Sequence, residues 1–160
     1  MPGFAAAIET ALERAEQHCL ARGARLTALR REVLGLILDR SAPVGAYELL
    51  DALQARRGPA APPTVYRALD FLQEQGLVHR IERLSAYIGC LGHAHGEAGT
   101  EHAAQFLICR ACGQAFEIDD HALEAALGAA AAKLGFTLGR ATIEAEGVCA
   151  ACRAACRAAG

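Results

Sequence analysis

Apolar side chains recur every three to four residues through the first half of the chain, which is the spacing of amphipathic helices. This spacing predicts four helices, at residues 3–21, 28–40, 46–56 and 62–75. Thr27 has a side chain suited to the N-cap of the second helix, and Gly76 suits the position after the fourth. Proline and glycine clusters at 41–45 and 58–61 separate the helices. The pattern therefore predicts a helical first half.

The pattern changes after residue 76. Short strands are predicted at 77–81 and 86–90, so that three or four helices precede a β-hairpin, which is the order of a winged helix-turn-helix domain. Residues 89–100 are rich in glycine and histidine and show no period, which is typical of a hinge or loop. The later elements are strands at 104–109 and 114–118, a helix at 120–134, a strand at 136–146, and a short cysteine-bearing helix or turn at 149–159.

These elements predict an α+β protein with two domains. We expect a winged-helix domain at 1–83, a hinge and metal-bearing loop at 84–103, and a C-terminal α/β domain with a small sheet at 104–160.

The fourth helix has two different faces. At about 100° per residue, an apolar back consists of Val65, Ala68, Leu69 and Leu72. The opposite face carries Thr64, Tyr66, Arg67 and Asp70. Arg67 can give a bidentate bond to guanine or hold a phosphate, and Tyr66 can contact a thymine methyl group or a phosphate. A solvated face on a plain helical bundle is the alternative, and the predicted wing favours DNA reading.

The net charge of −2 argues against a generally basic surface that coats nucleic acid. Residues 1–83 have 11 basic and 10 acidic side chains, a charge of +1, and the remainder has 5 and 8, a charge of −3. DNA contact must therefore come from local arginine placement. No apolar run is long enough to span a membrane, and the start of the chain does not resemble an export signal. We therefore expect a cytoplasmic protein. In that reducing compartment its seven cysteines are expected to be metal ligands or reactive thiols rather than disulfides.

Four of the cysteines form two pairs with the spacing of zinc knuckles, Cys109-x2-Cys112 and Cys149-x2-Cys152. Each pair places two thiolates on one tight turn, and two such turns complete a tetrahedral shell. A closed shell of four sulfurs has no open position and predicts a structural zinc site. Cys156 could substitute for one ligand, and Cys19 on a helical face is expected to be packing.

Four further residues carry metal-binding side chains without a telling spacing: His79, Cys90, His102 and Glu117. By spacing alone, the favoured interpretation is a wing-surface histidine, a packed cysteine, a loop histidine and a solvated glutamate.

The run from Pro62 to Leu72 (PPTVYRALDFL), the paired cysteine motifs and the order of elements resemble the ferric uptake regulator family. The resemblance extends from residue 21 to 152 and is closest to the zinc uptake regulator branch. It includes three further short motifs: Arg25-Leu26-Thr27, Ala46-Tyr47 and Gly147-Val148-Cys149-Ala150-Ala151-Cys152.

The resemblance implies a zinc-responsive repressor that binds palindromic double-stranded DNA operators of zinc-uptake genes as a homodimer. It implies about two Zn²⁺ per chain. The structural ion is held by Cys109, Cys112, Cys149 and Cys152, and the regulatory ion by His79, Cys90, His102 and Glu117. The resemblance also implies that residues 104–160 form the dimerisation domain. The DNA-contacting residues would be Tyr47, Thr64, Tyr66 and Arg67.

Other interpretations remain open at this point. Cys90 favours zinc over an iron or peroxide sensor of the same family, because hard-metal sensors use nitrogen and oxygen ligands. His93 and His95, in an unusually glycine-rich stretch, form an extra weak zinc site, replace His102, or have no role in metal binding. The alternative from another class, a zinc hydrolase or thiol oxidoreductase, needs an open metal position or a nucleophilic cysteine paired with histidine. We expect no catalysis, no small-molecule substrate and no membrane partner.

Overall fold

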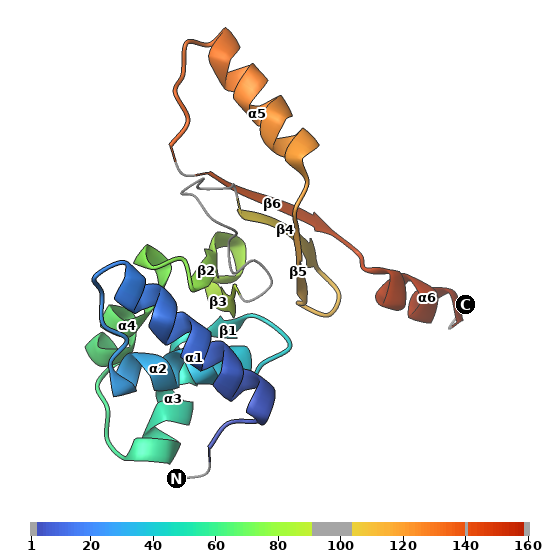
Figure 1. Cartoon of the computed structure of the whole chain (residues 1–160). Helices are drawn as coiled ribbons and strands as arrows, with labels where there is room; N and C mark the ends of the chain where they lie inside the picture. Colours follow the sequence, from blue (N-terminus) through green and yellow to red (C-terminus); the bar gives the residue numbers. More distant parts are fainter. Residues whose placement is uncertain (1–2, 91–103, 140, 159–160) are drawn as a thin grey trace. The chain divides into compact units, whose positions relative to one another are not determined.

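The structure is a computed structural model that describes residues 3–90, 104–139 and 141–158. The chain divides into two compact units, Met1–Ala94 and His95–Gly160 (Figure 1). Among the described residues, no helix is both long and apolar enough to cross a membrane. Helices combined with two small sheets confirm the predicted α+β fold class.

The first unit begins with four helices that surround one core. They are α1 (Ala6–Ala21), α2 (Ala28–Leu38), α3 (Ala46–Arg57) and α4 (Pro62–Glu74). The amphipathic spacing predicted for residues 3–21 is confirmed by three buried side chains of α1, Leu12, Ala15 and Cys19. Thr27 caps α2 as expected, since its side chain accepts a hydrogen bond from the Arg30 N–H. Helix α2 ends at Leu38 rather than near residue 40, because the chain then turns into a short strand.

The wing is a three-stranded antiparallel sheet, in which the two strands that follow α4 are joined by a short strand from between α2 and α3. Its strands are β1 (Val44–Gly45), β2 (Val78–Ile81) and β3 (Ala86–Gly89), in the order β1-β3-β2. The turn between β2 and β3 contains a short 3₁₀ helix, η1 (Glu82–Leu84), and Ser85 in the left-handed region at φ 47°. Strand β1 was not predicted, because two residues are too few to show an alternating pattern.

The second unit is built on a three-stranded sheet in the order β5-β4-β6. Its elements are β4 (Ala104–Cys109), β5 (Ala115–Ile118), α5 (His121–Lys133), β6 (Thr142–Gly147) and α6 (Ala150–Ala158). Strand β4 pairs antiparallel with β5 and parallel with β6.

The predicted strand at residues 136–146 is wrong in its first part, because β6 begins only at Thr142. A parallel pairing with β4 requires the chain to return along α5 to the start of the sheet before the strand can begin. Residues 136–139 belong to that return and are not in a strand.

Candidate metal centres and nucleic-acid interface

Four cysteine side chains meet at one end of the second sheet. Cys109 ends β4, Cys112 lies in the β4–β5 turn, Cys149 follows β6, and Cys152 lies in the first turn of α6. Their sulfur atoms all lie within 4.8 Å of one another, and all four are free thiols. A tetrahedral zinc site with Zn–S bonds of about 2.3 Å has sulfurs about 3.8 Å apart. The 4.0 Å between the sulfurs of Cys112 and Cys149 is close to that value.

Backbone N–H groups surround this cluster. The Cys149 N–H donates to the sulfur of Cys109 at 3.3 Å, and the Cys152 N–H donates to the sulfur of Cys149 at 3.4 Å. Hydrogen bonds to a thiolate favour the charged form. The Cys149 N–H, followed by that of Cys112, lowers the pKa of the Cys109 thiol to about 6.

Cys152 shows the opposite shift. Its thiol is hydrogen-bonded first to Cys149 and then to Cys112, and this raises its pKa to about 12. Loss of its proton would add a negative charge beside the Cys109 thiolate, which also raises the pKa. Several thiols at this separation cannot all ionise without a compensating cation. The cluster therefore fits a soft divalent cation such as Zn²⁺ in both geometry and charge.

The two other cysteines with open roles are placed clearly. Cys156 is exposed on α6, one turn beyond Cys152, and does not belong to the group of four. Cys19 is fully buried in the core of the first unit, and burial raises its pKa. Its environment agrees with the packing role expected from the sequence.

Two of the proposed regulatory ligands lie side by side in the first unit. His79 is on β2, and buried Cys90 follows β3, with its N–H donating to the Leu77 carbonyl at 3.0 Å. A ring nitrogen of His79 and the Cys90 sulfur lie within 4.8 Å of each other. Sequence spacing alone did not predict this contact, because it depends on the antiparallel pairing of β2 with β3.

One further proposed regulatory ligand belongs to the second unit. Glu117 is half-buried on β5 of the second unit. His102, His93 and His95 lie outside the described residues.

Helix α4 has the two faces that its sequence predicts. Val65, Ala68, Leu69 and Leu72 are buried, which confirms the apolar back. Tyr66, Arg67 and Asp70 are exposed, and Thr64 is half-buried. Two prolines, Pro62 and Pro63, occupy the first turn, where a missing N–H is tolerated. The helix thus presents polar side chains near its N-terminal end, as a major-groove reader requires.

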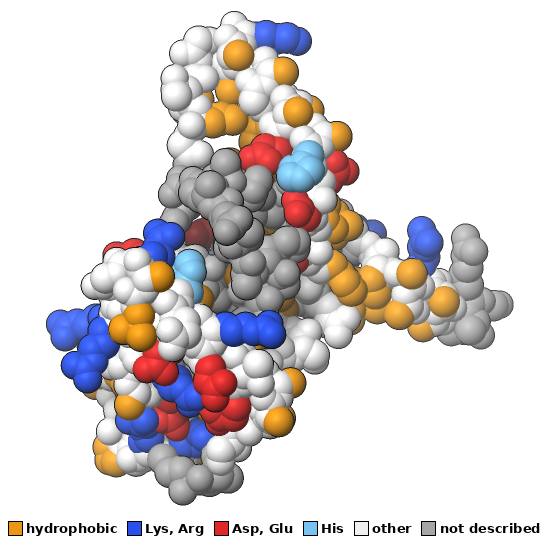
Figure 2. Space-filling model, viewed as in Figure 1, with side chains coloured by type: hydrophobic (Ala, Val, Ile, Leu, Met, Phe, Trp, Pro, Cys, Tyr) orange, Lys and Arg blue, Asp and Glu red, His pale blue; other side chains and the backbone are white. Residues whose placement is uncertain are grey.

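Tyr47 lies in the first turn of α3, with 69% of its surface exposed. A tyrosine this exposed contributes little to packing and is available for contact with a partner. Basic and acidic side chains are interspersed over the visible face of the first unit, without a continuous basic surface (Figure 2). This agrees with the near-neutral charge of residues 1–83, so any DNA contact by this unit must come from individual side chains.

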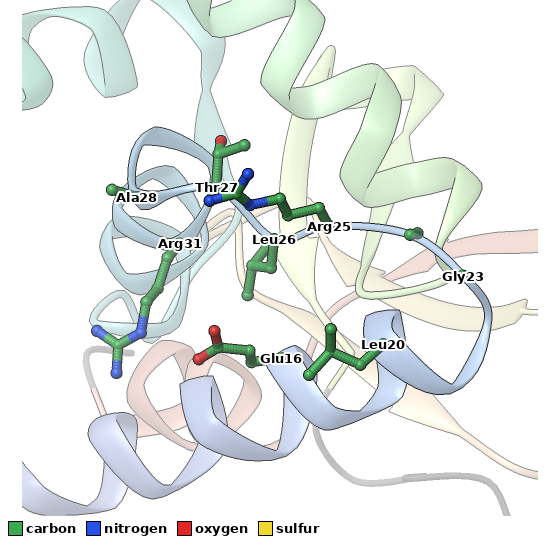
Figure 3. Close-up of a pocket in the computed structure, with 9 residues that line it drawn as sticks. Glu16, Leu20, Gly23, Arg25, Leu26, Thr27, Ala28 and Arg31 are labelled. Atoms are coloured by element: carbon green, nitrogen blue, oxygen red, sulfur yellow. The ribbon is translucent and has the colours of Figure 1, made fainter.

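A pocket of about 560 Å³ lies between the second half of α1 and the first turn of α2 (Figure 3). Leu20 and Leu26 contribute apolar surface, and Glu16, Arg25 and Arg31 contribute charge. Its lining contains neither histidine nor cysteine. It therefore does not provide the nucleophile–base pair that a thiol-dependent enzyme would need.

Two features were missed by the sequence reasoning. One is the set of backbone N–H groups that face the cysteine sulfurs, which the tight turn of a Cys-x2-Cys motif should have suggested. The other is Glu32, a carboxylate buried on α2 between two arginines of α3. The sequence around Glu32 does not indicate that this side chain is buried and paired, because its two arginine partners lie on a different helix.

A winged helix joined to a small α/β unit with a four-thiol cluster defines a metal-binding protein of the winged-helix class. A family model described as the ferric uptake regulator family matches residues 21–146. The chain belongs to the ferric uptake regulator family.

Individual relatives agree with this assignment. The zinc uptake regulation protein of Escherichia coli (strain K12) is 43% identical over 141 residues, which cover 88% of this chain and 80% of that protein. The zinc uptake regulation protein of Mycobacterium tuberculosis (strain CDC 1551 / Oshkosh) is 35% identical over 136 residues, with 83% and 98% covered. A solved zinc uptake regulator, complexed with zinc and DNA, gives a TM-score of 0.86 at 40% identity and covers 94% of this chain and 97% of its own.

Proposed function

We propose that this chain is a zinc-responsive transcriptional repressor that binds palindromic operators of zinc-uptake genes as a homodimer. The observation that carries the proposal is the adjacency of His79 and Cys90 at the base of the wing, in the same unit as the reading helix α4. A thiolate beside an imidazole favours Zn²⁺ over the harder metals of iron and manganese sensors. The regulator names of the relatives, and the solved complex with zinc and DNA, support the same function.

We propose two zinc sites per chain with different roles. The four-cysteine cluster holds a structural ion, and its closed shell leaves no position for a reactive water, which disfavours a hydrolase. The regulatory ion is held by His79 and Cys90 of the first unit and Glu117 of the second. His102 is the fourth ligand on the family resemblance, and His93 and His95 are the alternatives to it.

Zinc at the regulatory site supplies bonds of fixed length between side chains from both units. His79 belongs to the wing, Cys90 to the segment that leaves it, and Glu117 to the sheet of the second unit. We propose that the hinge between the two domains lies in the part of residues 84–103 that follows β3. A palindrome requires one spacing of the two reading helices, so a restrained hinge lowers the ordering cost of DNA binding.

The homodimer is proposed to form through the second unit. Among the described residues, seven of the eleven large hydrophobic side chains that are exposed belong to this unit. They are Leu107, Phe116, Leu123, Leu134, Phe136, Leu138 and Val148. Figure 2 shows hydrophobic side chains gathered along this unit. Leu134 and Phe136 are 85% and 65% exposed, an arrangement typical of a surface that a second subunit covers.

The direct test is a DNA-binding titration at fixed ionic strength, with and without added zinc. The probe is a duplex selected by the zinc-loaded protein from a randomised library. We expect zinc to tighten binding to this duplex by roughly 5–150-fold, as for a coupling of ~1–3 kcal/mol. Mn²⁺ and Fe²⁺ at the same free concentration serve as controls and should act more weakly. An affinity independent of zinc would contradict the proposal.

Arg67→Ala tests the assignment of α4 as the reading helix. We expect a loss of ~1–3 kcal/mol in binding the selected duplex, and relaxed preference at one base pair, if the guanidinium contacts a base. If it holds only a phosphate, affinities for selected and random duplexes fall together and the dependence on salt becomes shallower. Glu74→Ala, at the other end of α4, is the matched control. Unchanged binding of Arg67→Ala at every salt concentration would mean that another element reads the DNA.

A further inference from the structure

Glu32 is the one charged side chain that is buried among the described residues, with 7% of its surface exposed. It lies on α2, and each of its carboxylate oxygens accepts a hydrogen bond from an arginine at the end of α3. The Arg56 Nε donates to Oε1 at 2.8 Å, and the Arg57 Nε donates to Oε2. Arg57 also donates to the Ala28 carbonyl at the start of α2, at 3.3 Å. These contacts, which we call the Glu32 clamp, attach the C-terminal end of α3 to α2.

The clamp lies immediately before the turn that leads into the reading helix. Gly58 follows Arg57 and leaves α3 in the left-handed region at φ 87°. The turn is also held by Gln54, whose Nε2 donates to the Ala60 carbonyl at 2.8 Å. Helix α4 then begins at Pro62. The clamp and the Gln54 bond together restrain the turn from which the N-terminal end of α4 begins.

A buried ion pair is weak evidence for stability, because desolvation of the charges offsets much of their attraction. A geometric role suits this arrangement better. Contacts to base edges tolerate little displacement of the reading helix, whereas contacts to phosphates are made at any register along the duplex. The position of the α3–α4 turn therefore affects specific binding far more than non-specific binding.

We propose that Glu32 is a positioning residue for sequence-specific DNA recognition, acting by holding Arg56 and Arg57 so that the α3–α4 turn presents α4 in one orientation. This proposal rests on the proposed function as a DNA-binding regulator. In this proposal Glu32 does not touch DNA, yet it sets the ratio of the affinity for specific DNA to the affinity for non-specific DNA.

The test compares two affinities for each zinc-loaded variant: one for the duplex selected by the wild-type protein, the other for poly(dI-dC). Glu32→Gln keeps the size of the side chain and removes its charge. We expect its affinity for the selected duplex to fall by roughly tenfold, the effect of weakening a charged hydrogen bond. Its affinity for poly(dI-dC) should stay equal or rise, because the unit becomes one charge more positive.

Gln54→Ala is the second variant, since Gln54 is exposed and its loss should leave the fold intact. We expect a loss of several-fold for the selected duplex, no change for poly(dI-dC), and a melting temperature close to that of the wild type. Arg31→Gln is the matched control. It removes a 2.7 Å ion pair with Glu9, between α1 and α2, that does not involve the α3–α4 turn. Both of its affinities should stay within about twofold of the wild type, because the half-buried Arg31–Glu9 pair lies away from the α3–α4 turn.

A parallel fall of both affinities in Glu32→Gln would overturn the proposal, since general loss of structure would explain it. Unchanged affinity of both Glu32→Gln and Gln54→Ala for the selected duplex would overturn it as well. If Glu32→Gln fails to fold, the two affinities of Gln54→Ala decide whether restraint of the α3–α4 turn sets specific binding. Failure of the wild-type protein to select or bind any duplex in zinc is a different result, and it would refute the proposed function itself.

Discussion

Cys109→Ser is expected to lose about one zinc per chain and to unfold or monomerise the second unit. Cys109 is 2% exposed at the end of β4, and its sulfur accepts the Cys149 N–H from beyond β6. The cluster thus connects the β4–β5 turn to the start of α6. In small domains the apparent free energy of structural zinc binding is ~10–16 kcal/mol, and it is available only to the folded state.

Metal content by mass spectrometry and oligomeric state by analytical ultracentrifugation measure this result. Cys156→Ser is the control, because Cys156 is exposed on α6 and lies outside the group of four. It should retain both the zinc and the dimer, and a loss of zinc in this variant would make Cys156 a ligand. A well-folded dimer with full zinc content in Cys109→Ser would show that the cluster is not a structural site.

The same site predicts how zinc retention depends on pH. The Cys109 thiol has a pKa of about 6 in the folded protein, against about 8.5 for an ordinary cysteine. A pKa lowered in the folded state contributes stability above the unfolded value, and this contribution is lost as the pH falls through the folded one. Zinc also competes with protons for all four sulfurs. Transfer of zinc to a chelator should therefore become easier as the pH falls from 8 through about 6. Transfer that is independent of pH over this range would contradict the thiolate assignment.

Cys90→Ser is expected to abolish the zinc response of DNA binding while leaving a folded dimer. Cys90 is buried beside His79, and it is the proposed regulatory ligand that a hard-metal sensor would not supply. A serine hydroxyl is a poor ligand for zinc at neutral pH, so the segment that leaves the wing loses its bond to the ion. The full zinc-dependent gain, roughly 5–150-fold in operator affinity, should disappear.

Cobalt substitution separates this site from the structural one. Co²⁺ bound through Cys90 gives sulfur-to-metal charge-transfer absorption, which Cys90→Ser should remove while the four-sulfur absorption remains. Binding at this site should release a proton from the thiol and weaken at lower pH. Cys19→Ala, another buried cysteine of the same unit, controls for packing and should keep the zinc response. If Cys90→Ser responds to zinc with wild-type sensitivity, Cys90 is a packing residue, and His93 and His95 become the better candidates.

Much of the first unit could be predicted from sequence because its signals are local. The apolar back of α4, with Val65 and Leu69 buried, follows from a period of 3.6 residues and needs no knowledge of the rest of the chain. The Thr27 cap and the two Cys-x2-Cys motifs are local in the same sense. The regulatory ligand set was different: it came from the family resemblance, since spacing alone favoured ordinary roles for His79 and Cys90.

Tertiary structure decided the features that depend on which distant segments meet. Strand β1 exists because Val44 and Gly45 pair with Tyr87 and Ala86. A segment of two residues carries no sequence pattern that predicts a partner more than forty positions away. The late start of β6 follows from its parallel register with β4. The Glu32 clamp needs the charges of α3 to reach a carboxylate on α2. Periodicity determines which face of an element is apolar, whereas the partner of that face is set by chain path and packing, which act between residues far apart in sequence.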